Sequence, residues 1–234
     1  MKVAHYSYAC SMNDHCRFKI LLLIIAGLLN VIHADISTTF DHSTVVQKLY
    51  ASDAADQDLF SDSVAISGTT ALIGAVGDDD NGDSSGSAYI FEYNGTSWLE
   101  TAKLLPSDGA ANDKFGSHSA IDGNTAVVAS VNKSDNGSNS GAVYIVEYDG
   151  SSWNQTAKLT ASDASAEAYF GSGISISGNR LLVGAYGDSA NGSNSGAAYI
   201  FTYNGSSWVE TVKLLALDGV ADDYFGFGTS IEGD

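Results

Sequence analysis

Residues 63–108 read SVAISGTTALIGAVGDDDNGDSSGSAYIFEYNGTSWLETAKLLPSD, and the pattern of this stretch returns twice more, at residues 118–163 and 173–218. The three copies align without insertion or deletion, so that equivalent residues stand 55 positions apart. The step is marked by Trp98, Trp153 and Trp208, by Tyr89, Tyr144 and Tyr199, and by Lys103, Lys158 and Lys213. A period of this length indicates a tandem array of one supersecondary unit.

Each unit divides into four short apolar runs separated by turn residues. In the first copy they are Ser63–Ser67, Ala71–Val76, Ser87–Tyr93 and Ser97–Leu105. Asn94-Gly95 between the last two runs suits a type I′ hairpin turn, because both residues tolerate positive φ angles. Four antiparallel strands per tandem unit predict an all-β fold, a β-propeller of four-stranded antiparallel blades. A solenoid of stacked β units is the alternative, and the hairpin turns argue against it.

The repeat register predicts the following organisation: residues 1–34 a leader, 35–62 a lead strand and connector, 63–117, 118–172 and 173–227 three repeats, and 228–234 the start of a truncated fourth. Within the lead, residues 38–52 resemble the fourth strand of another blade. Propellers typically have four to eight blades, so about three complete blades predict a partial propeller. Either the chain is part of a longer protein, or open blade edges pair with another copy.

The leader contains an apolar run, Ile20–Ile32, preceded by Arg17 and Lys19. A transmembrane helix needs roughly 20 apolar residues, so this run is short for a span and suits a signal peptide. We place the cleavage after Ala34, and an uncleaved signal anchor is the alternative. Either reading predicts a secreted or cell-surface protein, with membrane attachment only if the leader is retained.

The net charge of -18 arises from 28 acidic and 10 basic residues. A surface this acidic repels nucleic acid, which excludes that class of partner. It could attract cations or basic partners, although solubility alone also explains it.

Two short motifs recur around the predicted strands. Phe115-Gly116 and its equivalents precede the first strand of a unit, and Gly74-Ala75 and its equivalents close the second. With the spacing of 55 residues, these motifs resemble the FG-GAP repeat of integrin α chains, over residues 48–234. The resemblance implies an extracellular binding or adhesion module that recognises a protein or glycan ligand through loops on one face. The alternatives are a non-catalytic propeller attached to an enzyme domain, and a structural surface or matrix protein without a specific ligand.

Acidic residues gather in the loop after the second strand of the first unit. Asp78, Asp80 and Asp83 are the candidate ligands of a Ca²⁺ ion there, since calcium takes six or more oxygen ligands. The calcium loops that the family implies lie between the first and second strands, where this chain has only a tight turn. The connectors carry a further periodic set, Asp53, Asp108, Asp163 and Asp218. We interpret these as caps of Asx-turns, and ion ligands are the alternative.

Six asparagines begin Asn-x-Ser/Thr sequons and are candidate N-glycosylation sites: Asn94, Asn132, Asn136, Asn154, Asn191 and Asn204. The residues after the leader contain two histidines, His42 and His118, in positions that are not equivalent in the repeat. The sequence contains none of the HExxH, GxSxG and P-loop motifs. We therefore expect a protein that is not an enzyme.

Overall fold

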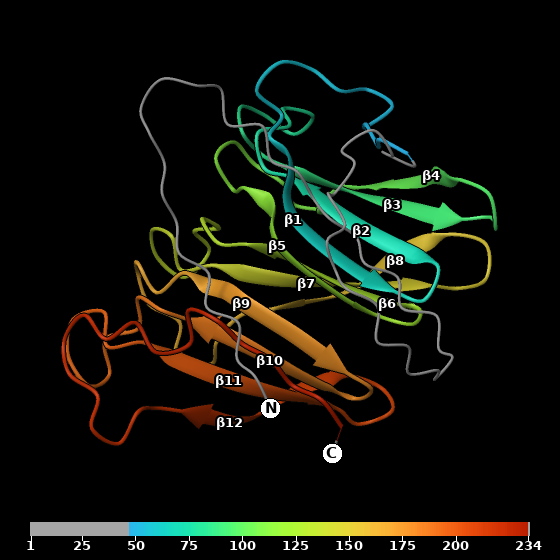
Figure 1. Cartoon of the computed structure of the whole chain (residues 1–234). Coiled ribbons are helices and arrows are strands. Elements are labelled where there is room, and N and C mark those ends of the chain that lie inside the picture. The colour runs from blue at the N-terminus through green and yellow to red at the C-terminus, as the bar shows by residue number, and fades with distance from the viewer. Residues whose placement is uncertain (1–46, 234) are drawn as a thin grey trace, which may run out of the picture. The chain divides into compact units, whose positions relative to one another are not determined.

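The structure is a computed structural model, and it describes residues 47–233. These residues form twelve strands in three four-stranded antiparallel sheets, and they contain no helix (Figure 1). Accordingly, residues 47–233 include no helix that is long and apolar enough to cross a membrane.

We call the sheets blades 1, 2 and 3. Blade 1 comprises β1 (Phe60–Ser67), β2 (Thr70–Ala75), β3 (Ser87–Tyr93) and β4 (Trp98–Leu104). Blade 2 comprises β5 (Phe115–Asp122), β6 (Thr125–Ser130), β7 (Ala142–Tyr148) and β8 (Trp153–Leu159). Blade 3 comprises β9 (Phe170–Ser177), β10 (Arg180–Ala185), β11 (Ala197–Tyr203) and β12 (Trp208–Leu214).

Each blade is a meander in which every strand pairs with its neighbour in the chain. The predicted all-β partial propeller is therefore confirmed. The predicted third strand, Ser87–Tyr93, agrees with β3 at both ends, whereas β1 begins three residues earlier than predicted, at Phe60. The difference arises because Phe60 pairs with Ala75 before a register shift that ends at Val64, so the residues before the predicted strand also belong to the ladder.

The core lies between the blades. Leu72, Ile90 and Leu104 on one face of blade 1 pack against Phe115 and Tyr144 of blade 2. The equivalent face of blade 2 packs in the same way against blade 3, where Phe170 and Tyr199 are almost fully buried. Because both faces of a middle blade are covered, its second strand is a continuous apolar run rather than an alternating one.

The Phe-Gly and Gly-Ala motifs meet across the boundary between two blades. A side-chain Cβ added at Gly74 in β2 would lie 2.0 Å from the backbone oxygen of Gly116 in β5. Gly116 itself has a φ of 92°, which favours glycine. Its carbonyl accepts a hydrogen bond of 2.7 Å from the Ser63 hydroxyl. The glycines thus allow the first strand of one blade to approach the second strand of the blade before it.

Residues 47–59 and 215–233, which flank the three blades, form no strand. Gln47 exchanges two hydrogen bonds of 2.7 Å with the backbone of Trp98, and Ser52 binds Glu100. The latter contact repeats between Ser162 and Glu210. Residues 47–52 therefore lie beside β4, as the connector after blade 2 lies beside β12. The fourth strand of a preceding blade at residues 38–52 stays a prediction. Residues 38–46 of that predicted strand lie outside the described residues, as does the leader.

Residues 228–233 form no strand, although they contact the first strand of blade 3. The backbone N–H groups of Ile231 and Gly233 donate to the hydroxyls of Ser175 and Ser177 in β9. No described strand pairs with this segment, so its ladder is absent. The face of blade 3 beside it is correspondingly more open, because Leu214 is 37% exposed where Leu104 is 5% exposed.

Candidate functional site

Loops from neighbouring repeats are joined at one end of the blades. The loop after the second strand of a blade pairs with the connector that leads into the next blade. In blade 1, the backbone N–H groups of Asn112, Lys114 and Phe115 donate to the carbonyls of Asp83, Ser84 and Ser85. The same three bonds recur from Glu167, Tyr169 and Phe170, and from Asp222, Tyr224 and Phe225. We call this continuous set of loops and connectors the loop rim.

A polar network lies beneath the loop rim of blade 1. The hydroxyl of Tyr89, whose side chain is fully buried, donates to Asp53 at 2.8 Å and to Asp78 at 3.0 Å. The Lys103 ammonium lies 2.6 Å from Asp53, 2.8 Å from Asp78 and 2.7 Å from Asp80. Lysine from β4, tyrosine from β3 and aspartates from two loops are thereby joined at one point.

The network repeats in the other blades. In blade 3, Tyr199 and Lys213 bind Asp163 and Asp188 with similar distances. Blade 2 departs from the pattern, since Lys133 stands where the other blades have Asp78 and Asp188. The Lys133 ammonium instead donates to Asp113 at 2.8 Å and to the backbone oxygen of Asp108 at 2.6 Å. One buried position thus accepts either sign of charge when a partner of opposite sign is nearby.

The charges of this network shift the pKa values of its members. The hydrogen bond from Lys103 lowers the pKa of Asp53. Burial tends to raise the pKa of Asp108, but hydrogen bonds from Lys158 and Tyr144 outweigh it and lower the value. Burial tends to lower the pKa of Lys103, whereas the bonds to Asp53 and Asp78 raise it well above its ordinary value. Asp53, Asp108 and Lys103 are therefore charged at neutral pH.

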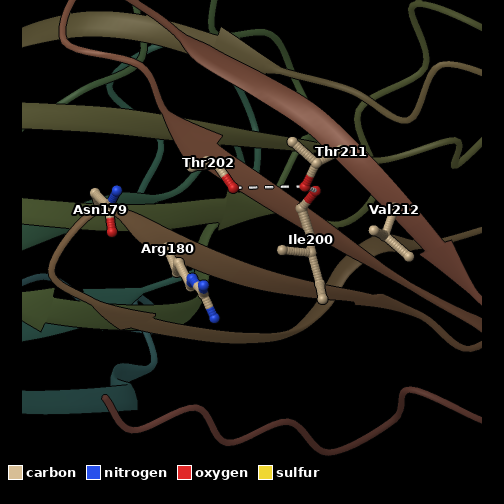
Figure 2. A pocket seen from close by; sticks show the side chains of 6 residues that line it. All are labelled: Asn179, Arg180, Ile200, Thr202, Thr211 and Val212. Atoms are coloured by element: carbon tan, nitrogen blue, oxygen red, sulfur yellow. Dashed lines mark hydrogen bonds between the residues drawn. The ribbon is translucent and has the colours of Figure 1, made fainter. Parts of the chain in front are cut away.

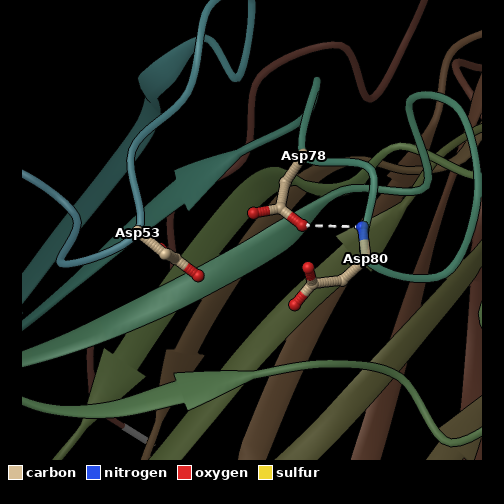
Figure 3. A group of neighbouring side chains, drawn as sticks. All are labelled: Asp53, Asp78 and Asp80. Carbon is tan, nitrogen blue, oxygen red and sulfur yellow. Dashed lines mark hydrogen bonds between the residues drawn. The ribbon is translucent and has the colours of Figure 1, made fainter.

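The predicted calcium ligands are only partly brought together. Asp78 and Asp80 lie near each other, and the third carboxylate of the group is Asp53 rather than Asp83 (Figure 3). One oxygen from each of these three carboxylates falls within 4.8 Å of the others. A carboxylate oxygen of Asp83 instead accepts a hydrogen bond from the neighbouring Ser84 hydroxyl.

The Asp53, Asp78 and Asp80 group does not fit a divalent cation as it stands. The Lys103 ammonium contacts all three carboxylates at 2.8 Å or less, so it takes the position that a cation would need. A calcium ion there would have to displace a lysine whose side chain is only 18% exposed. Calcium binding through Asp78, Asp80 and Asp83 stays a prediction.

The periodic aspartates of the connectors have a role that the sequence did not predict. Asp53, Asp108 and Asp163 each accept hydrogen bonds from a tyrosine and a lysine that are 36 and 50 residues further along the chain. The sequence did contain a signal for this network. The aspartates, tyrosines and lysines all recur with a step of 55 residues, and residues that share one period can also meet at one site in each repeat.

The six sequon asparagines lie at the surface. Asn94, Asn136, Asn154, Asn191 and Asn204 are exposed, and Asn132 is half-buried. The Asn94 side chain accepts bonds from the backbone of Thr96 and Ser97, which shows that hairpin geometry also requires it. Glycosylation of these positions stays a prediction.

A polar cavity lies on the open face of blade 3 (Figure 2). It has a volume of about 310 Å³ and is lined by Asn179, Arg180, Ile200, Thr202, Thr211 and Val212. In blades 1 and 2 the isoleucines equivalent to Ile200 are fully buried by the next blade. This cavity is therefore a consequence of the uncovered face.

The family model of the FG-GAP repeat matches residues 44–91, 98–146, 153–201 and 208–234. The chain belongs to the FG-GAP repeat family. No curated protein matches the chain. Among solved structures, this FG-GAP chain is similar to Sqt1 of Saccharomyces cerevisiae, at 11% identity and a TM-score of 0.44 over 70% of this chain and 38% of that one. It is also similar to the computationally designed protein Ika4, at 12% identity and a TM-score of 0.43 over 74% of this chain and 80% of that one. The FG-GAP chain thus spans well under half of the yeast protein.

Proposed function

We propose that this FG-GAP chain is an extracellular binding module that recognises a protein or glycan ligand through its loop rim. The observation that carries the proposal is the constant backbone of the rim combined with its changing side chains. The same three backbone hydrogen bonds join loop to connector at each of three junctions. Loops that a rigid scaffold holds in this way are where binding residues concentrate in other folds.

The repeated residues are engaged elsewhere. Phe115 and Phe170 fill the boundaries between blades, and Tyr89, Tyr144 and Tyr199 are held in the polar networks. Packing therefore accounts for the periodic aromatic residues. Rim residues that differ between repeats and lie outside these networks are the ones available to a ligand.

The module is proposed to be non-catalytic and to lie outside the cell. The predicted signal peptide supports export, and the exposed sequons suit an exported chain. The acidic surface disfavours nucleic acid as a partner. Attachment to an enzyme domain in a longer chain, or a structural role in a matrix without a specific ligand, would be the alternatives.

Two measurements test this proposal in order. The intact mass and terminal sequences of the native secreted product show whether the leader is removed and which further segments accompany the repeats. The same product is then applied to arrays of glycans and of extracellular proteins. Saturable binding to one class of ligand is the expected result. An intracellular product, or the lack of saturable binding on both arrays, would contradict the proposal.

A further inference from the structure

Four aromatic side chains gather at the junction after blade 3. Tyr186 stacks on Tyr169, with ring centres 4.9 Å apart and planes within 9°. Tyr224 meets Tyr186 edge-on at 5.9 Å, and Phe227 lies 5.6 Å away. The rings of Tyr224 and Phe227 are 42% and 66% exposed. We call these four residues the aromatic cluster.

The repeat does not account for the aromatic cluster. Tyr186 stands where blades 1 and 2 have Val76 and Val131. Tyr169 and Tyr224 stand where the earlier connectors have Leu59 and Lys114. All four connector positions share one left-handed backbone conformation, with φ between 52° and 55°. The scaffold is thus the same at each connector, and only the two connectors that flank blade 3 carry a tyrosine at this position.

An open cavity of about 530 Å³ lies against the aromatic cluster. Tyr186, Tyr224, Phe227 and Asp223 line it. Its size falls in the range of small-molecule sites, which are mainly apolar with a few polar groups that set orientation. The ring faces provide the apolar part of such a site.

The polar side chains next to the cluster hold one another in place. The Tyr169 hydroxyl donates to Glu167 at 2.6 Å, and the Asn139 amide donates to the same carboxylate at 3.1 Å. The bond to Glu167 also raises the pKa of Tyr169 to about 12, so its hydroxyl stays protonated at neutral pH. Asn194 and Asp222 repeat the amide-to-carboxylate contact beside Tyr224, also at 3.1 Å.

We propose that the aromatic cluster is a subsite for a neutral sugar ring of a glycan, which rests on the proposed function and names its ligand class. One face of a pyranose presents C–H groups that pack on aromatic rings, because the ring face carries the negative part of the quadrupole. Its hydroxyls can donate to a carboxylate, and the carboxylate of Asp223 lines the cavity beside the rings. Glu167, Asp222 and Asp223 repel anionic ligands.

The test measures binding of the full secreted chain to immobilised neutral glucans, mannans and galactans. Sialylated glycans and a surface bearing quaternary ammonium groups are the comparison arms. The variant Tyr186→Val restores the residue of blades 1 and 2, so we expect it to fold. It should bind the neutral glycan roughly tenfold more weakly than the parent. Tyr93→Val removes an exposed tyrosine of blade 1 and should leave binding unchanged.

The other outcomes separate the two proposals. Binding to a glycan or a protein that Tyr186→Val leaves at full strength overturns the sugar subsite and retains the binding module. Binding to the ammonium surface alone shows that the occupant is a cation, which also overturns it. If the parent binds neither glycans nor extracellular proteins, the proposed function itself fails. Circular dichroism of both variants shows whether a loss of binding reflects a loss of fold.

Discussion

Lys103 decides the charge balance of the polar network in blade 1. Its ammonium contacts three carboxylates, and that of Asp78 is only 6% exposed. Removing one partner of a buried ion pair is more costly than replacing both, because the remaining charge stays unsolvated. Lys103 therefore stabilises the junction between the connector, the loop and β4.

We expect Lys103→Met to lower the free energy of unfolding by about 3 kcal/mol, since it leaves Asp78 buried without its cation. Urea unfolding monitored by tryptophan fluorescence measures the change. Lys114→Met, at an exposed connector position, is the matched control and should change stability by less than about 0.5 kcal/mol. Equal effects of the two substitutions would show that the network contributes nothing.

The Lys103→Met variant also tests whether Lys103 prevents calcium from binding to the neighbouring carboxylates. With the ammonium removed, Asp53, Asp78 and Asp80 become available to a divalent cation. We expect added Ca²⁺ to raise the melting temperature of Lys103→Met more than that of the parent chain. The opposite order would show that the parent binds calcium despite Lys103, as the sequence alone allows.

At the scale of the elements, the phenylalanine before each first strand reports how well its blade is covered. Phe115 and Phe170 are 1% and 0% exposed, whereas Phe225 is 37% exposed. The three residues are equivalent in sequence, so the difference arises from what lies next to them. Phe170 has a complete blade 3 around it, while Phe225 leads into a segment without strands.

We expect Phe115→Ala and Phe170→Ala each to lower the free energy of unfolding by about 3–5 kcal/mol, because each leaves a cavity between blades. The equivalent Phe225→Ala should have an effect of about 1 kcal/mol or less. Chemical denaturation of the three variants compares them in one background. Similar losses at all three positions would indicate that a partner or a further segment covers blade 3 in solution.

At the scale of the whole molecule, three polar networks occur within residues 47–233, and they make the stability depend on pH. The pKa values of Asp53, Asp108 and Asp163 are lowered in the folded chain. A carboxyl with a lowered pKa binds fewer protons when folded than when unfolded. Its contribution to stability is therefore present above the ordinary aspartate pKa of 3.8 and is lost as the pH falls through the folded value.

We expect the free energy of unfolding to be nearly constant from neutral pH to about pH 5 and to fall at lower pH. Urea unfolding at a series of pH values measures this dependence. Asp163→Asn removes one of the titrating groups and should give a shallower slope below pH 5. A slope that the substitution leaves unchanged would assign the acid sensitivity to other carboxyls.

The open face of blade 3 bears on the predicted self-association. Val212 and Leu214 are 43% and 37% exposed there, while Leu104 and Leu159, which are equivalent to Leu214, are buried. We expect the full chain to associate through this face in sedimentation velocity experiments, because exposed apolar sheet surface favours pairing. The double substitution Val212→Glu and Leu214→Glu should shift it to the monomer. Leu99→Glu, on β4 of blade 1, is the control, and equal shifts would place the contact elsewhere.

The fold could be predicted from the local periodicity of the sequence. Strand and turn signals are local properties of the chain. Because the repeat has a strict step of 55 residues, each signal occurs three times at equivalent positions. The four-stranded blades, a hairpin between β3 and β4 and the family followed from that pattern. The type I′ turn predicted at Asn94-Gly95 is wrong, because only Gly95 has a positive φ and Tyr93 pairs with Trp98 across a longer loop. Strand β1 was predicted too short, because its pairing through Phe60 depends on a β-bulge opposite β2 rather than on its own residues.

The site depended on contacts between residues that lie far apart in the chain. Asp53, Asp78 and Asp80 meet at Lys103, and Asp83 does not join them, because side-chain direction in a loop follows from its hydrogen bonds and not from sequence spacing. The aromatic cluster was visible in the sequence only as four departures from the repeat. The sequence thus established what each blade is, through local patterns. Only the tertiary structure established which charges neutralise one another and which aromatic rings remain open to a ligand, since both depend on how one blade approaches the next.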